Sequence, residues 1–399
     1  MKKLLSIFLV FILALLPFSV FAETDPDSFD MAVVNEIMKN TDIFNLKARS
    51  AILIDAKTGM VLYEKNADDR LPIASITKIM TSVIVMDHIK EGKLNYDDMV
   101  TVSEYAYSMG GSQVYLEPGE KFTVRELIEA VEIHSANDAA VALAEKIAGS
   151  EDAFVLMMNN RAKELGLKDT VFKDCTGLTD EGHYSTAREI AKFSAELINK
   201  HPEILEITTT QYKEFRPGPN YIAMWNRNRL IWFYNGANGL KTGFTTAAGY
   251  CLVGSAKRED LQLISVVLGE PNNNTRFAET AKLLDYGFYN FESVDIIKKD
   301  DYVKTVEVKK GVKDSVDLIY ADDFSYLIDK SKKDKLKIDI VTQDTLTAPV
   351  EKGTIIGYAR ITLDKEVIGN VNILTADTVE KASFFRLFIM MIKEWLTFK

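Results

Sequence analysis

The sequence predicts an α+β fold, in which an antiparallel sheet packs against a helical cluster, followed by a small all-β domain and a terminal amphipathic helix. Three observations support this prediction. Strand-like segments occur near both ends of residues 23–290 and enclose a run of helical patterns, as in a sheet built from both ends of one domain. Residues 291–378 show short alternating segments between Gly and Asp clusters, which is typical of β domains. Residues 379–399 have the periodicity of an amphipathic helix.

The first 22 residues form a segment of their own. Lys2 and Lys3 precede an apolar run over residues 4–16, and Ala22 stands where a signal peptidase requires a small residue. This order is typical of a secretory signal, and the apolar run is shorter than a membrane-spanning helix. We therefore predict an exported protein, with residues 1–22 as a signal peptide that is cleaved after Ala22.

Charge and composition exclude several classes of function. The 399 residues carry a net charge of −10, which becomes about −12 without the two signal lysines, so nucleic acid is not an expected partner. Nothing in the spacing of Cys175 and Cys251 indicates a disulfide, and we interpret both as small core residues. The four histidines have no metal-ligand spacing, and the sequence contains no His-Glu-x-x-His motif. We expect neither a metal site nor a cofactor.

A β-hairpin is expected near the start of the first domain, after a lead-in over residues 23–47 that no pattern assigns. Residues 51–55 and 60–64 have strand patterns, and the turn between them contains Gly59.

A buried helix is expected to begin near Pro72, because apolar residues recur at helical spacing from Ile76 to Met86. On this helix Ser75 lies in the first turn, and Lys78 lies on the same face, close enough for its amine to take the hydroxyl proton. No other serine in the chain is followed by a lysine three residues later. The alternative is that both side chains simply face solvent.

The middle of the domain is predicted to be mainly helical. A helix over residues 124–131 is expected to end near His134, and a second helix over residues 139–148 to begin after Asp138, its N-cap. The break between the two helices consists of Ser135, Ala136 and Asn137. Further helices are expected at residues 155–165, 186–200 and 276–288.

Strand patterns return at residues 238–243, 250–256 and 261–268. Together with the early hairpin, these segments would complete an antiparallel sheet. The first of them carries Lys241, Thr242 and Gly243.

The terminal helix packs eleven large apolar residues into the fifteen positions from 384 to 398. It is too short and too charged to span a membrane, and an interfacial helix lying along the membrane surface fits better. The alternative is a helix docked on its own domain, although so many aromatic side chains would then need covering. The polar residues that share one arc of this helix are Ser383, Arg386, Lys393, Glu394 and Thr397.

Three short motifs occur in a fixed order: Ser75-x-x-Lys78, Ser135-Ala136-Asn137 and Lys241-Thr242-Gly243. In this order they resemble the motifs of serine D-alanyl-D-alanine carboxypeptidases, the low-molecular-mass penicillin-binding proteins. The resemblance extends from the signal peptide to the terminal helix, and it implies a penicillin-binding/β-lactamase-like transpeptidase fold for residues 23–290. A lone Lys-Thr-Gly is a weak signal, because Lys57-Thr58-Gly59 matches it too, but that copy precedes the serine and lies in the predicted hairpin turn.

The resemblance implies that Ser75 is the nucleophile, Lys78 its base and Ser135 a proton relay. A lysine can act as a base at neutral pH only if burial or a nearby cation lowers its pKa from about 10.4, and Lys241 is a candidate for that cation. The resemblance further implies that the backbone N–H groups of Ser75 and Phe244 form an oxyanion hole, and that Lys241 and Thr242 bind the substrate carboxylate. The implied substrate-binding residues are Asn137, Lys241, Thr242, Gly243, Phe244 and Arg227. For Ser135 and Asn137 the alternative is a helix-capping role.

The implied function is a carboxypeptidase, held at the outer face of the cytoplasmic membrane by residues 379–399, that removes the terminal D-Ala of peptidoglycan pentapeptides and is acylated by β-lactams. Gly243 would let the peptide lie along the strand as an added β-partner. Two departures limit the resemblance. The first is that the second motif is Ser-Ala-Asn rather than the Ser-Asp-Asn of class A β-lactamases, and that no deacylating glutamate of that class is recognisable. The second is that Phe244 stands where some relatives have His. The alternatives are a DD-endopeptidase acting on cross-links and a non-catalytic penicillin-sensing or wall-binding protein.

Overall fold

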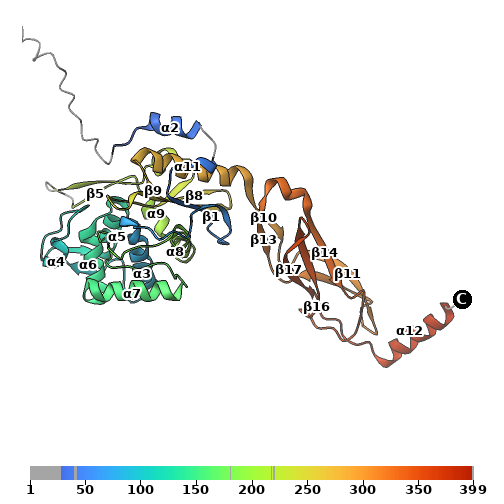
Figure 1. Ribbon diagram of the computed structural model, residues 1–399. Helices are drawn as coiled ribbons and strands as arrows, with labels where there is room; N and C mark the ends of the chain where they lie inside the picture. The colour runs from blue at the N-terminus through green and yellow to red at the C-terminus, as the bar shows by residue number, and fades with distance from the viewer. Residues whose placement is uncertain (1–27, 40–42, 180, 217, 219–220, 398–399) are drawn as a thin grey trace, which may run out of the picture.

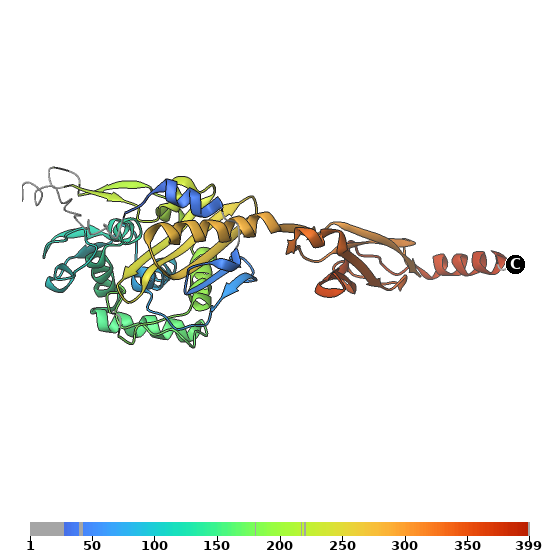
Figure 2. The ribbon, with the colours of Figure 1, turned by 45° about the horizontal axis from the view of Figure 1, so that its top comes forward.

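The computed structural model describes residues 28–39, 43–179, 181–216, 218 and 221–397. The predicted signal peptide lies outside these residues. The described chain forms a larger α+β domain, a β domain and a terminal helix, arranged one after another (Figures 1 and 2).

A five-stranded antiparallel sheet forms the centre of the larger domain, in the order β2-β1-β9-β8-β7. The early hairpin and the three late strands therefore join in one sheet, as the sequence predicts. Along β1, Ile52 and Ile54 face one hydrophobic core while Ala51 and Leu53 face another, so this strand is buried on both faces. The strands are β1 (Ser50–Asp55), β2 (Val61–Lys65), β7 (Ala237–Thr245), β8 (Gly249–Arg258) and β9 (Leu261–Glu270).

Helices cover both faces of this sheet (Figure 1). On one face lie α11 (Asn273–Asn290) and α2 (Met31–Lys39), the latter in the lead-in that the sequence left unassigned. Phe29 packs edge-on against Phe277 of α11, with ring centroids 5.4 Å apart, which holds this lead-in to the domain. The opposite face carries α3 (Lys78–Lys90), α5 (Val124–Glu129), α6 (Asn137–Ala148), α7 (Glu151–Glu164) and α8 (Ala187–Lys200).

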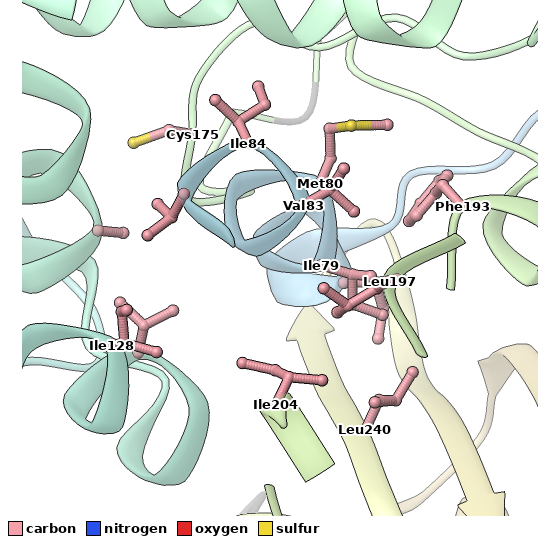
Figure 3. Close-up of a cluster of buried hydrophobic side chains, with 14 of the residues drawn as sticks. Ile79, Met80, Val83, Ile84, Ile128, Cys175, Phe193, Leu197, Ile204 and Leu240 are labelled. Atoms are coloured by element: carbon pink, nitrogen blue, oxygen red, sulfur yellow. The ribbon is translucent and has the colours of Figure 1, made fainter. Parts of the chain in front are cut away.

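Helix α3 is the central element of the helical layer. Its first nine residues are all buried, as expected for a helix that is covered on every side. Figure 3 shows Ile79, Met80 and Val83 of this helix among side chains from the neighbouring helices and from β7. Cys175 lies in the same core, and both Cys175 and Cys251 are buried free thiols, in agreement with the sequence analysis.

The helix after the Ser-Ala-Asn segment begins two residues earlier than predicted. Its N-cap is Ala136, and the expected cap, Asp138, instead accepts hydrogen bonds from the backbone N–H groups of Val114 (3.1 Å) and Leu116 (3.0 Å). The carboxylate is therefore used to anchor a distant loop rather than to cap the helix. The preceding α5 continues as the π-helical turn η3 (Ala130–His134) and ends at Ser135.

The β domain follows α11 without a loop, because β10 begins at the next residue. Its six-stranded sheet has the order β14-β16-β17-β12-β11-β15, and β10 pairs separately with β13. An apolar core that includes Leu318, Ile361 and Ile373 fills it. The strands are β10 (Phe291–Ile297), β11 (Tyr302–Lys309), β12 (Ser315–Tyr320), β13 (Phe324–Asp329), β14 (Leu336–Thr342), β15 (Thr345–Thr347), β16 (Ile355–Leu363) and β17 (Glu366–Thr375).

The terminal helix α12 (Phe384–Thr397) lies at the end of the β domain that is farthest from the larger domain (Figures 1 and 2). Large apolar side chains on it are exposed, with Phe384 at 85% and Phe385 at 72%. Among the residues that the structure describes, no helix has both the length and the apolar character needed to cross a bilayer. The remaining short elements of the larger domain are η1 (Ile43–Asn45), η2 (Ala74–Thr77), β3 (Met99–Thr101), α4 (Glu104–Tyr107), β4 (Lys121–Thr123), α9 (Ile204–Thr208), β5 (Tyr212–Phe215), β6 (Ile222–Trp225) and α10 (Leu230–Phe233).

Candidate active site

Ser75 and Lys78 are in direct contact. Ser75 lies in the short turn η2, and the Lys78 ammonium, at the start of α3, donates a hydrogen bond to its Oγ (3.0 Å). Lys78 Nζ also donates to Asn137 Oδ1 (2.5 Å) and to the carbonyl oxygen of Thr176 (2.7 Å). The Asn137 amide is held in this orientation because its Nδ2 donates to the Gly110 carbonyl oxygen (2.7 Å).

This geometry directs the lone pair of Lys78 when the side chain loses its proton. A neutral amine keeps two N–H groups and one lone pair, and the oxygens of Asn137 and Thr176 can only accept. Both N–H groups are therefore used on these two oxygens, and the lone pair faces the hydroxyl of Ser75. The solvent-facing alternative for Lys78 is wrong, because this side chain is fully buried.

Burial is the main reason that both site lysines have lowered pKa values. It lowers the pKa of Lys78 to about 8, against the opposing influence of nearby acids such as Asp174 and Glu132. It also lowers the pKa of Lys241 to about 7, with further lowering by the charge of Lys78. The sequence left burial and a nearby cation open as causes of a lowered pKa of Lys78, and burial is the cause found. With this pKa about a tenth of Lys78 is neutral at pH 7, far more than for a lysine of ordinary pKa.

Backbone conformation is unusual at the Ser75 turn and at the Ser-Ala-Asn segment. Ala74 and Ser135 have φ values of +47° and +65°, a region that non-glycine residues rarely occupy. The chain packs tightly behind Ala74, since a Cβ atom on Gly177 would lie 1.9 Å from the Ala74 carbonyl oxygen. Both strained turns therefore depend on their surroundings, which is common at functional sites.

A chain of hydrogen bonds holds the turn before Ser75. The backbone N–H of Lys173 donates to His183 Nδ1 (3.2 Å), which in a neutral ring leaves the proton on Nε2. That Nε2 lies 2.8 Å from Thr77 Oγ1, and Thr77 Oγ1 donates to the Ala74 carbonyl oxygen (2.8 Å). Lys173 and His183 belong to no motif found in the sequence, and Thr77 occupies an unspecified position of Ser75-x-x-Lys78, so sequence reasoning missed this chain of hydrogen bonds.

The Ser-Ala-Asn segment contributes a second wall of the site. Ser135 ends the π-helical turn η3 and lines the same pocket as Ser75. Asn137 lies at the start of α6, and its backbone N–H donates to the Ser112 carbonyl oxygen (2.8 Å). No side chain caps α6, so the helix-capping alternative does not describe Ser135 or Asn137.

The third wall is strand β7, which packs directly on the turn that carries Ser75. A Cβ atom on Gly243 would lie 2.9 Å from the Ile73 carbonyl oxygen and 3.3 Å from Ala74 Cβ. The absent side chain of Gly243 thus permits the close approach of β7 to η2. Lys241 and Thr242 are buried beside it, whereas Phe244 is 43% exposed. The other Lys-Thr-Gly sequence, Lys57-Thr58-Gly59, does not belong to these walls, because it lies in the turn between β1 and β2, as predicted.

A polar pocket of about 200 Å³ opens between the three walls. It contains Arg276, a residue that the sequence placed only on a predicted helix. Arg276 is buried, and its Nη1 donates to the Gly243 carbonyl oxygen (3.2 Å). Only the fold brings this residue of α11 to the strand, which explains why no local pattern indicated it. The lining residues are Ser75, Ser112, Ser135, Arg227, Arg229, Thr242, Gly243, Phe244, Asn273 and Arg276.

Comparison with known proteins decides the family. Residues 35–272 match the family model described as D-alanyl-D-alanine carboxypeptidase, and residues 291–381 match the C-terminal domain of penicillin-binding protein 5. The chain belongs to the D-alanyl-D-alanine carboxypeptidase family. The resemblance seen in the sequence is therefore confirmed, and with it the α+β fold and the all-β C-terminal domain.

Relatives in this family align over nearly the whole chain. D-alanyl-D-alanine carboxypeptidase DacF of Bacillus subtilis is 41% identical over 404 residues, covering 100% of both chains. DacC of Escherichia coli is 41% identical over 349 residues, covering 86% of each. The crystal structure of penicillin-binding protein 5 from Haemophilus influenzae matches with a TM-score of 0.70 and 36% identity, covering 84% of this chain and 98% of that one. The protein is thus a serine-type carboxypeptidase with a penicillin-binding-protein fold.

Proposed function

We propose that Ser75 is the nucleophile that removes the terminal D-Ala from peptidoglycan pentapeptides, with Lys78 as its base. The observation that carries this proposal is the arrangement around Lys78 Nζ, where two carbonyl-type acceptors leave the lone pair for the Ser75 hydroxyl. No other side chain is needed to activate the serine.

The proposed reaction has two steps. Lys78 takes the Ser75 proton as Oγ attacks the carbonyl carbon, and the backbone N–H groups of Ser75 and Phe244 stabilise the negative oxygen. The proton then passes through Ser135 to the amine of the departing D-Ala as its C–N bond breaks. Water hydrolyses the resulting ester and restores Ser75. A β-lactam would acylate the same serine; among the relatives, penicillin-binding protein D2 of Listeria monocytogenes has solved structures in ampicillin-bound and cefotaxime-bound forms.

Strand β7 supports the proposed mode of substrate binding. It is the edge strand of its sheet, so its outer edge can pair with an extended peptide. In this arrangement Asn137 hydrogen-bonds the substrate amide, while Lys241, Thr242 and Arg227 bind the terminal carboxylate. Arg276 adds a further buried cation to the carboxylate end of the pocket.

The direct test is release of D-Ala from a peptide ending in D-Ala-D-Ala, with wild type compared with Ser75→Ala. We expect release by the wild type only, and covalent labelling by a fluorescent penicillin at Ser75 only. Equal release by the variant would disprove the role of Ser75. A cross-linked dimeric peptide in the same assay distinguishes the endopeptidase alternative, and an inert wild type that still binds penicillin would support the sensing alternative.

We also propose that the protein is exported and held at the outer face of the cytoplasmic membrane. In this proposal residues 1–22 are cleaved as a signal peptide, residues 23–290 are the catalytic domain, residues 291–378 are a spacer, and α12 within residues 379–399 lies on the membrane. The exposed aromatic side chains of α12 support membrane contact. Deleting residues 379–399 should release the protein from sedimented membranes while D-Ala release in solution continues. Continued sedimentation of the truncated protein would exclude this anchor.

A further inference from the structure

Glu132 is a buried acid that the proposed mechanism does not use. It lies in the turn η3, three residues before Ser135, and is 3% exposed. Its Oε1 accepts a hydrogen bond from Ser82 Oγ on α3, one helical turn after Lys78. The Glu132 carboxylate therefore joins two of the elements that carry catalytic residues.

This buried acid interacts electrostatically with two buried lysines. The charges of Lys78 and Lys241 both act on Glu132, and the Glu132 charge in turn raises the pKa of each lysine. Two buried ammonium groups are costly without a counter-charge, since desolvation of each ion costs several kcal/mol. Burial raises the pKa of Glu132, while Ser82 and the two lysines oppose that shift.

The two lysines have different surroundings apart from Glu132. Lys78 is also influenced by Asp174, Asp138 and Cys175. Lys241 is instead acted on by the positive charges of Arg227 and Arg276. The charge of Lys241 also acts on His134, whose pKa burial lowers to about 4. Glu132 is thus the acid that acts on both lysines.

We propose that Glu132 is a positioning residue of the active site, whose carboxylate, fixed by Ser82, is the shared counter-charge of Lys78 and Lys241. It is positioned by η3 and α3 and acts through the two lysines rather than on the substrate. The inference rests on the proposed roles of Lys78 as base and Lys241 as the carboxylate-binding cation.

A shared counter-charge has a specific signature in the pH profile of acylation. Acylation requires neutral Lys78, whose fraction falls toward acid pH, and charged Lys241, whose fraction falls toward alkaline pH. Without the negative charge of Glu132, both lysines lose their protons at lower pH. Both limbs therefore move in the same direction, toward acid, whereas a purely structural defect lowers the rate at every pH.

The test is the pH profile of acylation by a chromogenic cephalosporin, measured for the full chain and for Glu132→Gln, which preserves the shape of the side chain. We expect both limbs to move by about one pH unit toward acid, so that acylation on the acidic limb is up to about tenfold faster than in wild type. The matched control is Glu129→Gln, on the preceding helix, where Glu129 pairs with Lys213 (2.5 Å). We expect no movement of either limb in that control.

Two results would overturn the proposal: unmoved limbs in Glu132→Gln, or an equal movement in Glu129→Gln. If Glu132→Gln does not fold, Ser82→Ala serves as the second variant. Loss of the Ser82 hydrogen bond favours protonated Glu132, so we expect a smaller movement in the same direction, and unmoved limbs would again overturn the proposal. Failure of the proposed function is distinguishable, because wild type would then release no D-Ala from the peptide or show no acylation, whereas failure of the present proposal leaves both activities of wild type intact.

Discussion

The larger domain and the β domain differ in what their cores contain. The core of the larger domain includes charged side chains that are almost fully buried, among them Lys78, Lys241, Glu132 and Arg276. In the β domain, Thr375 is the only buried polar side chain among the residues that the structure describes after position 290. The two domains thus differ in how many charged and polar side chains they bury.

This difference indicates where function lies. A buried charge is destabilising unless partners compensate it, so a domain selected only for stability has no reason to retain several. In the larger domain Lys78 contacts Ser75, and Arg276 lines the Ser75 pocket. The apolar core of the β domain agrees with the spacer role proposed for it, between the larger domain and α12 (Figure 2). The comparison leads to three predictions, from the largest expected effect on acylation to the smallest.

Lys78→Met should abolish function and remove a pH dependence of stability. Without its base, acylation of Ser75 by penicillin should slow by about 1,000-fold or more. In wild type the folded pKa of Lys78, about 8, lies below its ordinary value of 10.5, so between these values the unfolded chain binds more protons. The free energy of unfolding therefore rises with pH across this window, by about 3 kcal/mol from this residue.

Denaturant unfolding at pH 7 and at pH 10 measures this effect, with acylation followed by a fluorescent penicillin. We expect the rise in wild type to be reduced in Lys78→Met. If the free energy of unfolding rose with pH as much in Lys78→Met as in wild type, burial would not lower the pKa of Lys78. The contrast between the two domains would then lose its main support.

Gly243→Ala should impair the site through backbone displacement alone. The added methyl group would meet the Ile73 carbonyl oxygen at 2.9 Å, so β7 must move away from the Ser75 turn. A displacement of this size at reacting groups can slow acylation by up to about 100-fold. The matched control is Gly369→Ala in the β domain, where a Cβ atom would lie 2.3 Å from Phe324 Cε2. We expect the control to lower stability but to acylate at the wild-type rate, and slow acylation in the control would count against independent domains.

The sequence predicted the parts of the site that are encoded locally. Ser75 and Lys78 are three residues apart, so a helical turn is sufficient to bring them together, and the strand patterns were sufficient to place Lys241 on a strand of the sheet. Arg276, His183 and Glu132 were not recognised, because each acts through a contact between elements that only the tertiary structure brings together. The start of α6 was predicted incorrectly for the same reason: Asp138 resembles a helix cap locally, but its carboxylate binds a loop more than twenty residues away.

Leu318→Ala should have the smallest effect on function, and it tests the comparison most directly. Leu318 is fully buried in the apolar core of the β domain, so its truncation should lower the stability of that domain by about 2 to 5 kcal/mol. The counterpart is Ile79→Ala, the same kind of truncation in the core beside Lys78. Calorimetry and penicillin acylation should show that Ile79→Ala reduces both stability and rate, whereas Leu318→Ala reduces stability alone. If Leu318→Ala slowed acylation as much as Ile79→Ala does, the β domain would have to support the geometry of the Ser75 site, and a spacer role would no longer explain it.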